Sequence, residues 1–156
     1  MLKYYNFQLA LQEIPDEITL AINITGCPNY CDGCHSPWLQ EDTGTPLNEE
    51  VIDTILKNHD GFTCICFMGG DADHEAINRL AKYVKDKYSI KVAWYSGQNE
   101  LPKEIDLANF DYWKYGHFDK LKGGLDSIYT NQHLLKIKDN GKVLEDITHE
   151  FWDKKV

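Results

Sequence analysis

Three cysteines, Cys27, Cys31 and Cys34, fall within eight residues of this chain and are separated by three residues and then by two. This spacing places three thiolates on one short loop, where they can hold three irons of a cubic iron–sulfur cluster. The fourth iron is then left without a protein ligand. Because an iron with an open coordination position can bind a small molecule, the motif predicts a site of chemistry with these three cysteines as metal ligands.

Two other metal sites compete with this interpretation. A structural zinc site normally needs four Cys or His ligands, and His35 is a poor fourth ligand because it directly follows Cys34. An electron-transfer cluster normally has four cysteines, but Cys64 and Cys66 lie on an expected strand, which is a stiff place for ligands. All three sites stay open on the residues alone, and the spacing favours the three-cysteine cluster.

Composition limits the class of protein. We expect a single domain over residues 1–156. The formal net charge of −9 disfavours contacts with a phosphate backbone, so nucleic acid is not an expected partner. No apolar run reaches the ~20 residues that span a bilayer, and the N-terminus lacks the pattern of a signal peptide. A cytoplasmic protein without membrane contact is therefore expected, and its odd count of five cysteines argues against disulfides.

Apolar runs alternate with helical patterns along most of the chain. Strands are expected over residues 18–24, 62–68, 90–95 and 110–115. Helices are expected after Asn48, which can act as an N-cap, and over residues 73–87, with a short helix from Pro102. This alternation predicts parallel strands joined by crossovers. In such sheets, ligands bind at the carboxyl ends of the strands.

The C-terminal region has a different pattern. Asp139-Asn140-Gly141 separates two apolar runs, residues 133–138 and 142–144, and Asn-Gly in this setting is a strong hairpin signal. A last short helix is expected over residues 146–152. The tail therefore predicts a β-hairpin at one end of the sheet.

A second motif, Gly69-Gly70-Asp71, follows the expected strand at residues 62–68. Two glycines after a strand are common in tight turns, where they supply unusual backbone angles. This turn and Cys27 both follow strands that should be parallel. We therefore expect the two motifs to meet at one edge of the sheet.

The three-cysteine loop resembles the signature loop of the radical S-adenosylmethionine (SAM) enzymes. Residues 26–38 more closely resemble the anaerobic ribonucleoside-triphosphate reductase activating proteins, a family of glycyl-radical-enzyme activases. The matching segments outside the loop are residues 7–25, 114–118, 123–127 and 130–132. The resemblance implies an α/β fold: a partial (open) radical SAM barrel of parallel strands with a C-terminal β-hairpin.

The resemblance also implies an activity. A [4Fe-4S] cluster would reductively cleave SAM to methionine and a 5′-deoxyadenosyl radical, which would generate a glycyl radical on the anaerobic ribonucleoside-triphosphate reductase. Reduced flavodoxin is the implied electron donor. An activase of another glycyl-radical enzyme, of the pyruvate formate-lyase type, and an iron–sulfur electron carrier without SAM chemistry are the alternatives.

Site residues follow from the same resemblance, which implies no catalytic residue beyond the cluster ligands. The expected SAM-binding residues are Gly33, Cys34, His35, Gly69, Gly70 and Asp71. Asp71 would accept a charge-assisted hydrogen bond from the SAM ammonium group, although Ala72 replaces the family's usual proline. Asp111 and Lys114 are further expected to point into the cavity of the barrel. Cys64 and Cys66 are expected to pack in the core.

Overall fold

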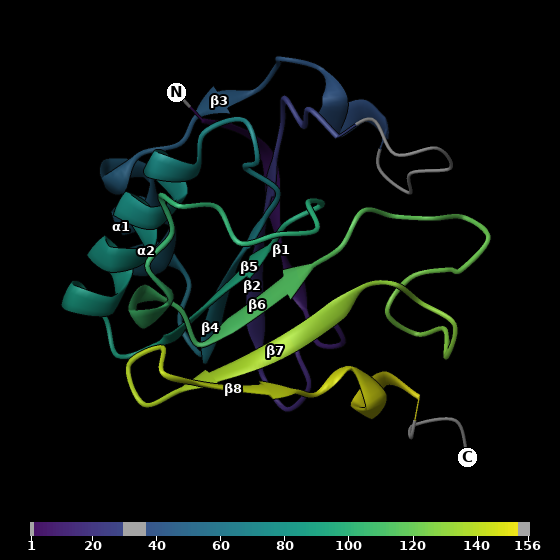
Figure 1. The fold of residues 1–156 in the computed structure, drawn as a ribbon. Helices are drawn as coiled ribbons and strands as arrows, with labels where there is room; N and C mark the ends of the chain where they lie inside the picture. Colours follow the sequence, from purple (N-terminus) through teal and green to yellow (C-terminus); the bar gives the residue numbers. More distant parts are fainter. Residues whose placement is uncertain (1, 30–36, 153–156) are drawn as a thin grey trace.

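The computed structural model describes residues 2–29 and 37–152. Two α-helices lie on one side of an eight-stranded mixed sheet (Figure 1), whose strand order is β3-β1-β2-β4-β5-β6-β7-β8. The strands are β1 (Lys3–Ala10), β2 (Thr19–Ile24), β3 (Thr45–Pro46), β4 (Cys64–Met68), β5 (Lys91–Tyr95), β6 (Tyr112–Tyr115), β7 (His133–Lys138) and β8 (Val143–Asp146). The α-helices are α1 (Glu49–Asn58) and α2 (His74–Lys87), and the 3₁₀ helices are η1 (Pro37–Gln40), η2 (Leu107–Asn109) and η3 (Thr148–Phe151).

The centre of the sheet is parallel. Strands β2, β4, β5 and β6 run in one direction, with Ile22 opposite Phe67 and Phe67 opposite Trp94. Antiparallel strands flank this centre, with β1 and β3 on one side and the β7–β8 hairpin on the other. The carboxyl ends of four strands therefore meet at one edge.

Local sequence explains where both helices begin. The Asn48 side chain accepts a hydrogen bond from the Val51 amide at 3.0 Å, and the Asp73 side chain accepts one from the Ala76 amide at 3.1 Å. Each cap satisfies an amide that the first helical turn leaves without a partner. The buried residues of both helices pack with one face of the sheet in the main hydrophobic core.

Alternation along the strands divides the interior into two parts. On β4, Ile65 and Phe67 face the helices and belong to the main core, whereas Cys64 and Cys66 face the other side. The second side holds a smaller cluster, which includes Tyr95 of β5. Neither α-helix contributes to it, and Ile14 and Ile147, which lie outside the strands, pack there instead.

The structure confirms the four central strands, the two capped helices and the C-terminal hairpin. It corrects three expectations: a strand, β1, precedes the one that we expected to be first, no helix begins at Pro102, and the C-terminal helix is the 3₁₀ helix η3. The first strand forms because β1 pairs along β2. After Pro102 and after Ile147 the backbone makes hydrogen bonds between residues three apart, Ile105 to Pro102 and Glu150 to Ile147, which are the bonds of turns and 3₁₀ helices. A partial radical SAM barrel stays a prediction. None of the helices in the described part of the chain combines the length and the apolar character that a membrane span requires.

Candidate functional site

The ends of the parallel strands are joined by backbone hydrogen bonds. The Gly69 amide donates to the Tyr95 carbonyl at 3.0 Å, and the Ser96 amide donates to the Lys114 carbonyl at 2.8 Å. The carboxyl ends of β4, β5 and β6 are thus held beside one another. Cys27 follows β2 at the same edge, so the first cysteine and the Gly-Gly-Asp turn meet as expected from the sequence.

The Asp71 carboxylate is the polar centre of this edge. Its Oδ2 accepts hydrogen bonds from Asn29 Nδ2 at 2.6 Å and from the Gly97 amide at 2.8 Å. Its Oδ1 accepts one from Ser96 Oγ at 2.7 Å and lies 3.2 Å from His74 Nε2. The side chain is only 1% exposed. All four acceptor positions of the carboxylate therefore have a partner, so a ligand ammonium would have to displace one of them.

Asn29 connects this carboxylate to the cysteine loop. Its Nδ2 lies 3.5 Å from Cys27 Sγ in addition to its contact with Asp71. Cys27 is a free, half-buried thiol whose amide donates to the Leu39 carbonyl at 2.9 Å. One side-chain amide thus bridges an expected metal ligand and the buried acid.

The two glycines of the turn have different structural roles. Both have positive φ angles, +110° at Gly69 and +97° at Gly70. A Cβ at Gly70 would lie 2.4 Å from Ile77 Cδ1, so close packing also requires glycine there. Gly69 instead lines a cavity, and its carbonyl accepts a hydrogen bond from Trp94 Nε1 at 2.7 Å. The turn geometry accounts for both glycines, and a role in SAM binding stays a prediction.

A cavity of about 740 Å³ opens at this edge, on the face that lacks α-helices. Its lining includes Gly69, Ser96, Gly97 and Leu39, which contacts Cys27. Such a volume is typical of sites for small organic ligands. The cavity therefore has room for a cofactor-sized molecule beside Leu39, whose carbonyl accepts the Cys27 amide.

Lys114 and Glu13, two residues of opposite charge type, line the same cavity. Lys114 Nζ donates to the Ser96 carbonyl at 3.2 Å and lies 5.7 Å from the centre of the Tyr95 ring. Burial raises the pKa of Glu13, while the positive charge of Lys114 opposes that rise. Lys114 thus takes the position expected for it.

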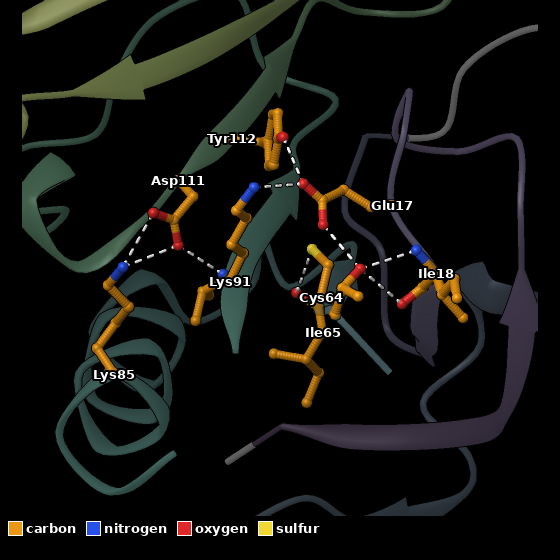
Figure 2. Close-up of polar contacts among 10 residues, drawn as sticks. Glu17, Ile18, Cys64, Ile65, Lys85, Lys91, Asp111 and Tyr112 are labelled. Carbon is orange, nitrogen blue, oxygen red and sulfur yellow. Dashed lines mark hydrogen bonds and ion pairs between the residues drawn. The ribbon is translucent and has the colours of Figure 1, made fainter. Parts of the chain in front are cut away.

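Asp111 does not point into this cavity. It lies at the opposite edge of the sheet, where its carboxylate binds Lys85 Nζ at 2.8 and 3.0 Å and the Val92 amide at 2.8 Å (Figure 2). The reason is position: Asp111 precedes β6, whereas Lys114 lies near its carboxyl end. The expectation for Asp111 was wrong.

Glu17 forms a second polar cluster at that opposite edge. Its carboxylate accepts hydrogen bonds from Thr63 Oγ1, Lys91 Nζ and the Tyr112 hydroxyl at 2.7, 2.8 and 2.7 Å (Figure 2). Burial by itself would raise the pKa of Glu17, but these hydrogen bonds outweigh it and hold the pKa below its usual value. Since every acceptor oxygen has a partner within the protein, the cluster links strands.

The remaining sequence-based residues have two outcomes. Cys31, Gly33, Cys34 and His35 lie outside the described residues. Cys64 and Cys66 are fully buried, as expected for core packing. Burial raises the pKa of both thiols, with nearby carboxylates adding to the rise. Within the described ranges, no group of three His, Cys, Asp or Glu residues could hold a metal ion.

Sequence reasoning missed Asn29 and His74 as partners of Asp71. An amide inside a ligand loop is a detectable signal, because amide hydrogens commonly bond to cluster sulfurs. Asn29 and Asp71, however, are 42 positions apart in the sequence. No local pattern reports a pairing of this kind.

The comparisons with known proteins bear on the metal centre. The family model of the 4Fe-4S single cluster domain matches residues 18–108, which is more than half of the chain. The chain therefore belongs to the family of 4Fe-4S single cluster domains. No curated protein and no solved structure matches it.

The described residues fit this family. Cys27 presents a free thiol at the edge of the sheet where the cavity opens, and thiolates are the usual ligands of iron–sulfur clusters. The matched range also includes Cys31 and Cys34. A cluster ligated by Cys27 would have the Asn29 amide within 3.5 Å of one of its ligand sulfurs.

Proposed function

We propose that the chain is a radical SAM activase that generates a glycyl radical on an anaerobic ribonucleoside-triphosphate reductase. The observation that carries the proposal is the cavity of about 740 Å³ lined by Leu39, whose carbonyl accepts the amide of Cys27. A simple electron carrier needs no room for a second ligand next to its cluster. A cluster with three cysteine ligands and an adjacent cavity suits a cofactor that binds the fourth iron.

In this proposal Cys27, Cys31 and Cys34 hold the cluster and the cavity holds SAM. When bound and reduced, the cluster would supply the electron that breaks the C5′–S bond of SAM. Lys114 and Glu13 offer opposite charges to the charged groups of an amino acid. Asp71 would take the SAM ammonium group in exchange for one of its present donors.

In this proposal the reductase would contact the segment between β6 and β7. Phe118 and Leu125 of this segment line the cavity. Leu121, Ile128 and Tyr129 are large apolar residues that are exposed on it. Exposed apolar groups beside a cavity mouth favour contact with another protein, here the glycine loop of the reductase.

The first experiment measures SAM cleavage. Anaerobically reconstituted protein, reduced with dithionite and mixed with SAM, is expected to form 5′-deoxyadenosine. An intact cluster without this product would instead identify an electron carrier. Reduced flavodoxin in place of dithionite tests the proposed donor.

The second experiment identifies the target enzyme. The activated mixture is incubated with the anaerobic reductase or with pyruvate formate-lyase, and the glycyl-radical doublet is recorded by EPR. The proposal expects the doublet on the reductase. A doublet on pyruvate formate-lyase alone would establish the alternative activase.

A further inference from the structure

The geometry points to Asn29 as a positioning residue that donates a hydrogen bond to the Cys27 thiolate and raises the reduction potential of the cluster. The two hydrogens of its amide have two acceptors, Cys27 Sγ at 3.5 Å and Asp71 Oδ2 at 2.6 Å. This inference rests on the proposed function only in taking Cys27 as a cluster ligand. It does not require SAM chemistry.

The orientation of the amide follows from its surroundings. The Asn29 oxygen could not face Asp71, because two acceptors would then meet without a hydrogen between them. Asp71 is itself held by Ser96 Oγ at 2.7 Å and by the Gly97 amide at 2.8 Å. The buried acid therefore directs the amide hydrogens, and one of them is available to sulfur.

Gly97 packs directly against the Asn29 side chain. A Cβ at Gly97 would lie 2.6 Å from Asn29 Nδ2 and 3.2 Å from its Cγ. Glycine at this position lets the amide lie against the backbone. Gly97→Ala should thus displace Asn29 while retaining the amide that binds Asp71.

The physical effect is electrostatic. Reduction adds negative charge to a cluster and its thiolates, so a hydrogen-bond donor to sulfur stabilises the reduced state more than the oxidised state. Removal of the donor should make the potential more negative. Asn29 touches neither substrate nor cofactor in this account and acts through Cys27.

The test is a dye-mediated redox titration of the reconstituted full chain without SAM. In Asn29→Ala, we expect the ratio of reduced to oxidised cluster at a fixed potential to fall about tenfold, equivalent to about 59 mV for one electron. Gly97→Ala should shift the ratio in the same direction. Asn58→Ala, which changes an exposed asparagine at the end of α1, should leave it unchanged.

The double variant sharpens the test. If Gly97→Ala acts by displacing Asn29, the two substitutions share one interaction, and the double variant should shift no further than Asn29→Ala. Cluster lifetime against a chelator is the second readout, and we expect it to shorten in both single variants. Failure to take up a cluster at an unchanged urea midpoint would be the extreme of that result.

Unchanged potential and lifetime in Asn29→Ala would overturn the inference, as would additive shifts in the double variant. Failure of the proposed function gives a different result. A wild-type protein that holds its cluster but does not cleave SAM would contradict the activase and leave this titration valid.

Discussion

The Tyr112 hydroxyl donates to the Glu17 carboxylate at 2.7 Å, although 95 residues separate the two in sequence. The same carboxylate oxygen accepts from Lys91 Nζ at 2.8 Å, and the other oxygen accepts from Thr63. The Glu17 side chain precedes β2 and is only 4% exposed. It therefore connects the start of β2 to the starts of β4, β5 and β6. The acid is thus a structural residue at the edge away from the cysteine loop.

Replacement of Glu17 by glutamine should destabilise the fold. Glu17→Gln keeps the shape of the side chain but replaces a charged carboxylate, whose two oxygens accept these bonds, with a neutral amide that has one acceptor oxygen. We expect a loss of about 1–3 kcal/mol in the free energy of unfolding. Urea denaturation measures it. Glu145→Gln, which removes an exposed partner of Lys138, should leave the midpoint unchanged, and an equal loss there would contradict the role of Glu17.

The effect of Glu17→Gln should depend on pH. The hydrogen bonds hold the folded-state pKa of Glu17 below its usual value despite burial. Its stabilising contribution is therefore complete above the unfolded pKa of about 4.3 and is lost as the pH falls through the folded pKa. The wild type and variant should converge in urea stability below that range. A difference that widens towards acid would show the opposite shift.

Gly70 should not tolerate a side chain. Gly61→Ala is the matched control, because Gly61 also has a positive φ of +86° but has open space around a Cβ. Strain alone should cost Gly61→Ala about 1–2 kcal/mol. Gly70→Ala should cost about 1–3 kcal/mol more, since its Cβ would strike Ile77. Equal losses in urea denaturation would show that Ile77 moves aside.

Cys64 and Cys66 should be unreactive in the folded protein. Both are buried, and their raised pKa values leave little thiolate at neutral pH. With the metal-free, reduced chain and a disulfide reagent, Cys64→Ala and Cys66→Ala should leave the number of rapidly reacting thiols unchanged. Cys27→Ala should lower that number by one. Rapid loss of a thiol in either strand variant would contradict the burial.

The cluster should depend on the loop cysteines alone. We expect Cys31→Ala to abolish both the cluster absorbance and SAM cleavage, because two thiolates cannot hold a cluster that needs three. Cys64→Ala should retain the cluster. A Cys31→Ala protein that still cleaves SAM would refute the ligand assignment, and a stoichiometric zinc ion in the anaerobically purified wild type would refute the cluster.

Much of the fold could be predicted from local sequence. The strands at residues 64–68 and 91–95 are short apolar runs, and Asn48 and Asp73 are good helix caps, so neighbouring residues alone specify these elements. The Asn-Gly turn likewise marks the hairpin. Strand β1 lacked such a signal, because its exposed residues break any clear apolar pattern.

The cysteine spacing by itself determined the kind of metal chemistry expected of this protein, because metal ligands on one loop need no distant partner. Only the tertiary structure decided that the Asp71 carboxylate already has four partners. It also decided that the Asn29 amide contacts both Cys27 and Asp71, and that Asp111 binds Lys85 at the edge of the sheet opposite the cavity. These contacts join residues that are far apart in the chain. Their geometry depends on how strands pair and helices pack, which no short stretch of sequence encodes.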